Sequence, residues 1–396
     1  MSYSLALPQS VILFQIPLLY LTNILSLALG PSRPLLRYGL ASPLFVLLLA
    51  QSLYREWDGV FGYHYALECM VLSVAFTYVD WNLLGNPDKQ KWRKIRYVDG
   101  KEEVEDVVGT GFWERAWWGV RLATGNRYVG WTQEAKNVVK EVGPGEEVSR
   151  VRFILRKALR AAWFHVLHNA ANALTAASPH GSWDDIKHVK PIESLTDRPF
   201  LMRWCYAWIH IALTYAALEE ANAAYGVVSV ATGLASPRDC PSAFGDLKEL
   251  VTVRKAWSRV WHQQCRRLCS GPGIFVARDV LHLRKGSFAS KYLQLFIGFG
   301  VSGIVHGGAS MFVHRSFDDD AALAFFLAQA FIIMVEDHVI ELGKSLGLKD
   351  SAFWRFVGFA WTVFALGAST QAWTSRVVGK GMWIHDRGQD YLGIGP

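Results

Sequence analysis

The feature that most constrains the fold is a series of long apolar stretches without charge. Residues 10–29 contain no Asp, Glu, Lys or Arg, and about 20 such residues in a helix cross the hydrocarbon core of a bilayer. Further apolar stretches are residues 35–53, 65–79, 204–216, 217–234, 293–313, 321–335 and 356–373, with a weaker one at 153–174. The sequence therefore predicts a polytopic membrane protein with roughly eight or nine membrane-spanning helices.

An all-α fold is expected because backbone amides in lipid must be satisfied within their own segment. The apolar stretches are continuous rather than alternating, which opposes a β-barrel. Charged residues make up 19% of the 396 residues, against about 25% in soluble chains. We expect one membrane domain over residues 1–396, with polar or interfacial intervals at 85–150 and 236–291.

The net charge of +7 predicts loops that face the cytosol and contact the bilayer surface, and no nucleic-acid partner. Basic residues gather at 89–101 and 254–284, so both loops are expected on the cytosolic side. The 5 cysteines are odd in number and scattered, which opposes a disulfide framework. His262, Cys265 and Cys269 lack a fourth ligand nearby, so no metal site is expected.

His306 is an ionisable residue within the uncharged stretch 293–313, where such a group is costly and by default functional. On a helix, Ser302 shares its face, while Gly303 and Gly307 allow another helix to approach closely. One interpretation is a structural histidine bonded to a carbonyl or to Ser302. The other is a general base, because a buried imidazole favours its neutral form and can take a proton from an alcohol that attacks a thioester.

Residues 251–269 are predicted to form a cationic amphipathic helix, with His262 and Gln263 at the boundary between its indole and basic faces. Such a helix can lie on anionic headgroups. Alternatively, it forms a positively charged entrance to a binding site and attracts a polyanionic cofactor such as coenzyme A.

Three other polar groups have the residue types of possible sites. The acidic run at 318–320 is expected to be a solvated loop. His165 and His168 lie three residues apart, but the chain lacks the histidine boxes of a di-iron enzyme. Glu336 and the two residues after it are expected to flank an apolar span, with a polar contact to an internal cavity as the alternative.

The sequence RKAWSRVWHQ at residues 254–263 resembles the RxFWGRxWHQ signature of wax-synthase-like membrane-bound O-acyltransferases. The match departs at Ala256 and Ser258, where Phe and Gly are usual. Four more elements match in order: Asn126-Arg127-x-x-Gly130-Trp131, Pro241-x-x-Phe244-Gly245, Ser302-Gly303-x-x-His306 and Glu336-Asp337. The resemblance covers roughly residues 120–345 and is strongest to fungal members that acetylate hydroxyl groups of terpenoids and meroterpenoids.

The resemblance implies a helical bundle that encloses a tunnel, in the endoplasmic reticulum membrane. Acyl-CoA, here acetyl-CoA, enters as co-substrate from the cytosol, a lipophilic terpenoid alcohol enters from the bilayer, and no cofactor is tightly bound. The expected residues are His306 and His262 for catalysis, Gln263, Trp261 and Ser302 for the oxyanion or acyl position, and Arg254, Arg259 and Arg266 for the CoA phosphates. Alternatives are a long-chain wax-ester or sterol-ester synthase and, from another class, a transporter or scaffold.

Overall fold

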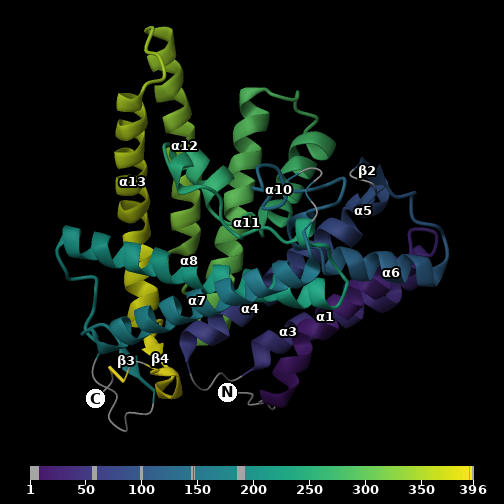
Figure 1. Ribbon diagram of the computed structural model, residues 1–396, viewed down its shortest axis with the longest axis horizontal. Coiled ribbons are helices and arrows are strands. Elements are labelled where there is room, and N and C mark those ends of the chain that lie inside the picture. The colour runs from purple at the N-terminus through teal and green to yellow at the C-terminus, as the bar shows by residue number, and fades with distance from the viewer. Residues whose placement is uncertain are drawn as a thin grey trace.

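The computed structural model describes residues 9–55, 60–98, 101–143, 146, 148–184, 192–391 and 393–394. Most of them are helical (Figure 1). The N-terminal part comprises α1 (Gln9–Leu29), α2 (Pro34–Leu36), η1 (Arg37–Ala41), α3 (Ser42–Tyr54), α4 (Phe61–Tyr78) and η2 (Val79–Leu83). Helices α2, η1 and α3 follow one another without a break, and Pro34 begins this segment, a position where its missing N–H costs nothing.

The middle of the chain contains the polar interval and two long helices. Its elements are α5 (Asn86–Lys89), β1 (Ile95–Val98), β2 (Lys101–Val104), α6 (Phe112–Ala123), η3 (Asn126–Tyr128), α7 (Arg150–Ala177), β3 (Ser182–Trp183) and α8 (Phe200–Ala231). Strands β1 and β2 pair antiparallel, and β3 pairs parallel with β4 (Ile384–His385) near the C-terminus. The all-α prediction is wrong at these two small sheets, which lie in polar segments where strand backbones need not be shielded from lipid.

The C-terminal part contains the longest apolar helices. Its elements are η4 (Pro237–Asp239), η5 (Leu247–Glu249), α9 (Val253–Lys255), η6 (Ala256–Val260), α10 (Arg266–Phe275), η7 (Val276–Val280), α11 (Phe288–His314), α12 (Ala322–Ser345), α13 (Ala352–Gly379) and η8 (Arg387–Gln389). In Figure 1, α11, α12 and α13 stand upright beside one another, and α7 and α8 run across their lower halves.

Four helical segments within the described ranges are long and apolar enough to cross a membrane: Pro34–Tyr54, Phe288–His314, Ala322–Ser345 and Ala352–Gly379. Helix α1 contributes a shorter apolar segment, Phe14–Leu29. The chain is therefore a membrane protein, but the predicted count of eight or nine spans is not confirmed. In particular, the two spans predicted at 204–216 and 217–234 are wrong, because both belong to the single helix α8.

Helix α8 continues through two adjacent acidic residues because α7 and a loop supply partners for them. Glu219 is fully buried, and its carboxylate accepts hydrogen bonds from the Arg160 side chain at 3.1 Å and the Phe244 backbone N–H at 3.1 Å. Glu220 contacts His165 and His168 of α7. A paired carboxylate does not have to leave the packed interior, so the helix has no reason to end there.

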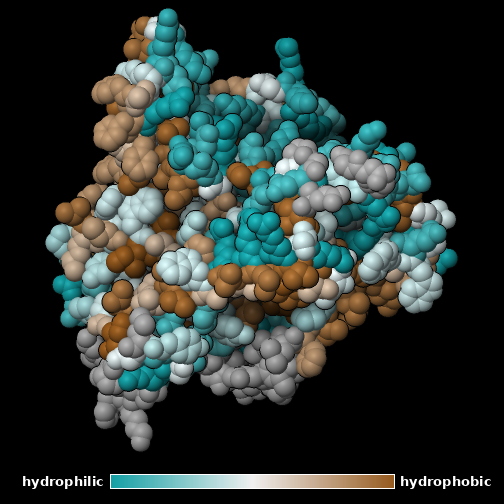
Figure 2. All heavy atoms as spheres, in the orientation of Figure 1, coloured by the Kyte–Doolittle hydropathy of each residue, from teal (hydrophilic) through white to brown (hydrophobic). Residues whose placement is uncertain are grey.

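The surface carries apolar residues where a lipid contact is expected. Figure 2 shows hydrophobic side chains gathered along α13, whereas hydrophilic side chains cover the part of the molecule that carries α10 and β2. Phe353, Phe356 and Phe364 are among the exposed large residues of α13. A continuous apolar face of this kind is unfavourable in water and suits a hydrocarbon environment.

Candidate active site

His306 lies in the middle of α11, and one of its ring nitrogens is held by α4. The Tyr65 hydroxyl lies 2.8 Å from His306 Nδ1, and Cys69 Sγ lies 3.6 Å from the same atom. Within the described part of the chain, the other ring nitrogen, Nε2, has no hydrogen-bond partner. The ring is thus fixed at one nitrogen and leaves the second available for chemistry.

Aromatic rings from two other helices enclose the imidazole. Phe326 of α12 stacks on His306 with ring centroids 5.0 Å apart, and Trp373 of α13 meets it edge-on at 5.3 Å. The ring centroid of His210 of α8 lies 5.4 Å from that of Trp373, and His210 hydrogen-bonds to Thr374 at 3.0 Å. Four helices therefore converge on His306 in a mostly apolar setting.

His262 lies in the loop before α10, close enough to His306 for an electrostatic effect between the two imidazoles. Burial lowers the pKa of the His262 imidazole well below its ordinary value, and the electrostatic effects of His306 and Arg127 lower it further. Its Nδ1 is buried without a hydrogen-bond partner among the described residues. His262 thus lies within electrostatic range of His306, and its lowered pKa makes it neutral at physiological pH.

The helix predicted over residues 251–269 is wrong. Helix α9 and the π-helical turn η6 end at Trp261, whose φ of −66° and ψ of 150° are extended, and α10 begins only at Arg266. The side chain of Gln263 compensates for the break, because its amide donates to the carbonyls of Trp257 at 2.9 Å and Trp261 at 2.6 Å. A side-chain donor replaces the missing backbone donors, so the loop satisfies its polar groups without helix.

Gln263 and Arg266 are both occupied within this loop. Gln263 is buried and uses both amide hydrogens on backbone carbonyls. Arg266 donates to the Gln263 side-chain oxygen at 2.6 Å and to the Ser258 carbonyl at 3.2 Å. These contacts fix the loop that carries His262.

Two acidic residues of α12 bind the start of α9, the helix that leads into the loop carrying His262. The Glu336 carboxylate accepts the backbone N–H groups of Val253 at 2.8 Å and Arg254 at 3.0 Å, and it also accepts the Trp361 indole N–H at 3.2 Å. Asp337 receives two hydrogen bonds from the Arg254 guanidinium, at 2.7 and 2.6 Å. The acidic pair is therefore more than an interface flank, because it anchors the histidine-bearing loop to α12.

The three predicted CoA-binding arginines lie in different environments. Arg254 is engaged by Asp337 and Arg266 by the loop itself. Arg259 has a side chain 48% exposed, and its only ion pair among the described residues is with the half-exposed Glu249 at 3.3 Å. Arg259 is therefore the most available of the three for an external anion.

Close packing of α11 fixes the orientation of its polar face. A Cβ atom on Gly303 would lie only 2.9 Å from Cα of Leu323, so glycine permits α12 to approach here. Ser302 Oγ lies 3.2 Å from Cys269 Sγ on α10. The glycine-mediated approach predicted from the sequence is confirmed, and Ser302 contacts α10 rather than His306.

Two of the family-like motifs, at 126–131 and 241–245, are joined by hydrogen bonds. Arg127 is buried and donates to the carbonyls of Pro241 at 2.7 Å and Ser242 at 2.6 Å. The ring of Phe244, two residues after Ser242, meets Trp261 edge-on at 5.1 Å and His262 at 5.9 Å. The Asn126–Arg127 element thus supports His262 through the Pro241–Phe244 turn.

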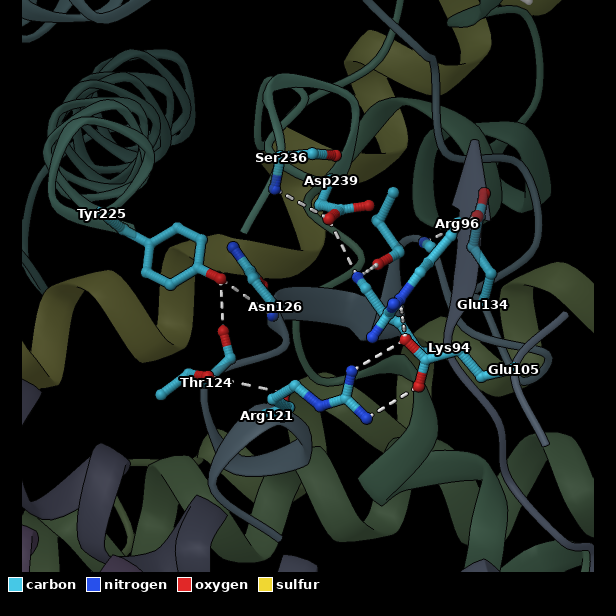
Figure 3. A network of polar contacts seen from close by, with 12 residues as sticks. Lys94, Arg96, Glu105, Arg121, Thr124, Asn126, Glu134, Tyr225, Ser236 and Asp239 are labelled. Atoms are coloured by element: carbon cyan, nitrogen blue, oxygen red, sulfur yellow. Dashed lines mark hydrogen bonds and ion pairs between the residues drawn. The ribbon is translucent and has the colours of Figure 1, made fainter. Parts of the chain in front are cut away.

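Figure 3 shows the polar network that supports this arrangement from outside. Lys94 forms an ion pair with Asp239 at 2.9 Å, and Arg121 binds Glu105 at 2.9 and 2.8 Å. The Tyr225 hydroxyl of α8 accepts the Asn126 backbone N–H at 3.2 Å. The network ties the 85–150 interval to α8 and to the turn at 237–239.

The predicted tunnel stays a prediction. A surface hollow of about 530 Å³ is lined by residues of the 92–121 segment, such as Trp92, Glu114 and Arg121, and none of the predicted site residues lines it.

The prediction of a solvated loop at 318–320 is wrong for Asp320, which is fully buried and pairs with Lys380 at 2.5 Å.

Sequence reasoning missed Tyr65 and Cys69, the two residues that touch His306 Nδ1. Both lie in the first ninety residues, where only hydropathy was informative. A hydroxyl and a thiol one helical turn apart in an apolar helix were the available signal. Their partner His306 is 241 and 237 positions away along the chain, so the contact itself could not be predicted from the sequence.

Comparisons with known proteins agree with this geometry. Residues 240–328 match the membrane bound O-acyl transferase family. The acetyltransferase sirH of Leptosphaeria maculans is 46% identical over 392 residues, which are 98% of this chain and 96% of the relative. The chain belongs to the membrane-bound O-acyltransferase family. It is therefore an acyltransferase that uses an acyl-CoA co-substrate.

Two further relatives carry similar names. The acetyltransferase ple2 of Rhodocybe pseudopiperita is 29% identical over 343 residues, 85% of each chain. The acetyltransferase eriL of Hericium erinaceus is 32% identical over 290 residues, 73% of this chain and 72% of the relative. No solved structure matches the chain significantly. The resemblance inferred from the short motifs is confirmed by these relatives, one of which spans 98% of this chain.

Proposed function

We propose that this acyltransferase moves the acetyl group of acetyl-CoA to a hydroxyl of a terpenoid or meroterpenoid alcohol at the endoplasmic reticulum membrane. The observation that carries the proposal is His306, which is held at Nδ1, has no Nε2 partner among the described residues, and lies within electrostatic range of the neutral His262. The names of the three relatives, all acetyltransferases, support acetyl as the group transferred. The terpenoid acceptor rests on the motif resemblance and on the apolar surroundings of the site.

The proposed reaction is a direct transfer without an acyl-enzyme. His306 Nε2 accepts the proton of the alcohol while the alcohol oxygen bonds to the thioester carbonyl carbon. The tetrahedral intermediate then breaks its C–S bond, and the imidazolium returns the proton to the CoA sulfur. An apolar site that excludes water protects the thioester from hydrolysis.

His262 supplies a hydrogen bond to the oxygen that becomes negative in this step. Its neutral imidazole has one N–H to donate, and a preorganised donor at an oxyanion is worth about 3 kcal/mol of barrier. Trp261 and Gln263 position this ring, Gln263 through its bonds to the loop carbonyls. Ser302 acts on the acyl position indirectly, through the packing of α10 against α11.

Arg259 is the arginine to which we assign the main contact with the CoA phosphates, because it is half-exposed and weakly paired. Arg254 and Arg266 then contribute positive potential and hold the loop that presents Arg259. A cationic loop on the cytosolic side also raises the local concentration of a polyanionic co-substrate.

The experiment uses microsomes from a heterologous host that expresses the wild type, His306→Ala or the control His338→Ala. His338 is an exposed histidine on α12, so its replacement tests for non-specific loss. Isotope-labelled acetyl-CoA and a panel of hydroxylated terpenoids are supplied, and labelled ester is measured by mass spectrometry. We expect ester from the wild type and the control but not from His306→Ala.

Other outcomes distinguish the alternatives. Ester formation only with palmitoyl-CoA would replace the proposal with a long-chain ester synthase. Equal product from the wild type and His306→Ala would remove His306 from its assigned role. Absence of any ester with either acyl-CoA and the whole panel would contradict the acceptor class.

A further inference from the structure

The contact between Tyr65 and His306 joins helices that are far apart in the sequence. The Tyr65 side chain is buried on α4, and its hydroxyl lies 2.8 Å from His306 Nδ1. Cys69, one turn further along α4, lies 3.6 Å from the same nitrogen. The Tyr65 hydroxyl and the Cys69 sulfur thus both lie against the ring nitrogen that the proposed reaction does not use.

The direction of these hydrogen bonds decides what His306 can do. If Tyr65 donates to Nδ1, the neutral imidazole carries its proton on Nε2 and cannot act as a base there. If Tyr65 instead donates to Cys69 Sγ, its oxygen accepts the proton-bearing Nδ1, and Nε2 keeps a free lone pair. Cys69 offers the acceptor that makes the second arrangement available.

We infer that Tyr65 is a positioning residue that holds His306 in the tautomer with Nδ1–H, oriented by its own hydrogen bond to Cys69. This inference rests on the proposed function, because it concerns the base of that reaction. When His306 Nε2 takes the alcohol proton, the Nδ1–H bond to the Tyr65 oxygen stabilises the imidazolium in an apolar setting. The proton later leaves from Nε2 to the CoA sulfur, so Tyr65 neither gains nor loses a proton over the cycle.

The groups that face His306 are known on each side. Tyr65 and Cys69 belong to α4, His262 to the loop before α10, and His210 to α8, near enough to act on His306 electrostatically. Asp320 acts on Tyr65 in the same way. A change confined to the Tyr65 hydroxyl leaves the other groups in place, so a difference in pH profile between two variants reports on that hydroxyl.

The test is Tyr65→Phe, which removes one oxygen and keeps the ring. A hydrogen bond to a charged group justifies an expected loss of about ten- to a hundredfold in kcat, with the KM for acetyl-CoA changed less than about twofold. Loss of the acceptor destabilises the imidazolium, so the acid limb of the rate profile should move to lower pH. The matched control is Tyr63→Phe on the same helix, because Tyr63 is 59% exposed.

A purely structural role of Tyr65 would lower the yield of folded protein without moving the acid limb. If Tyr65→Phe does not fold, Cys69→Ala tests the same relay, with a smaller loss in kcat and a shift of the limb in the same direction. An unchanged limb and a kcat within about twofold of the wild type would overturn the inference. Absence of acetyl transfer by the wild type would overturn the proposed function itself, which separates the two failures.

Discussion

The ring of Phe326 lies almost parallel to the His306 imidazole, with an interplanar angle of 14° and centroids 5.0 Å apart. Phe326 is buried and also meets Trp373 at 5.6 Å, so the space beside the base is bounded by aromatic carbon. A wall in this position favours a short acyl chain, because a longer one needs room next to the atom that reacts.

Phe326→Leu should therefore broaden the acyl selectivity. One or two methylene groups in an apolar site change discrimination by about tenfold or more, so the ratio of butyryl to acetyl transfer should rise by about that factor. The measurement is a competition between the two acyl-CoAs, with Phe353→Leu on the exposed face of α13 as control. A ratio equal to that of the wild type would contradict the idea that Phe326 limits the chain.

His262 is expected to act as a neutral hydrogen-bonding group. Burial lowers its pKa, so the ring carries no charge at neutral pH. His262→Asn keeps a neutral donor and should retain more activity than His262→Ala, which removes it and should lose about a hundredfold in kcat. The rates of both variants with saturating acetyl-CoA provide the test. Equal loss in the two variants would assign His262 a role that needs the imidazole itself.

The candidate site residues are easier to single out from the sequence than the path of the chain between them. His306 stood out because an ionisable group in an uncharged stretch is costly, and the stretch 293–313 lies within α11. The break at Trp261 could not be predicted from periodicity, because the side chain of Gln263 stabilises it. A helix and a side-chain-supported loop share the same local pattern, and tertiary contacts decide between them.

The same limit explains the error in α8. The sequence predicts two spans, at 204–216 and 217–234, and Glu219 lies inside the second of them. Its carboxylate is neutralised by Arg160 and bound by the Phe244 N–H, partners 59 and 25 positions away. The effect of a polar residue on the local structure can be predicted only when its partners are known. Gln263 and Glu219 are two such cases, and the contact of Tyr65 with His306 is a third.

Variants of Arg254 and Arg259 should differ in effect, because we expect Arg254 to stabilise the fold and Arg259 to bind the co-substrate. Arg259→Gln removes a half-exposed cation and should raise the KM for acetyl-CoA about three- to tenfold, with little change in thermal stability. Arg254→Gln breaks a two-bond pair with Asp337 and should lower stability by about 1–2 kcal/mol, with kcat reduced because the loop that carries His262 loosens. Steady-state kinetics and thermal unfolding in detergent measure both effects. A raised KM at unchanged stability for Arg254→Gln would assign that residue to the CoA site instead.

The Glu141 carboxylate should make the free energy of unfolding depend on pH. Burial alone would raise the pKa of Glu141, but the Ser242 hydroxyl and the Lys157 ammonium outweigh it and lower the pKa to about 2 from 4.5. Because Ser242 also presents its carbonyl to Arg127, this carboxylate helps to hold the turn that contacts His262.

The sign of the effect follows from the depressed pKa. The stabilisation is complete above pH 4.5, the ordinary value, and is lost as the pH falls toward the folded value of about 2. Glu141→Gln should cost about 1–3 kcal/mol at neutral pH, since burying Lys157 offsets part of the gain. Thermal unfolding of the wild type and Glu141→Gln between pH 7 and pH 3 should give curves that converge on acidification. Glu341→Gln, at an exposed position of α12, should follow the wild type throughout, and a constant gap for Glu141→Gln would mean that packing rather than charge explains its role.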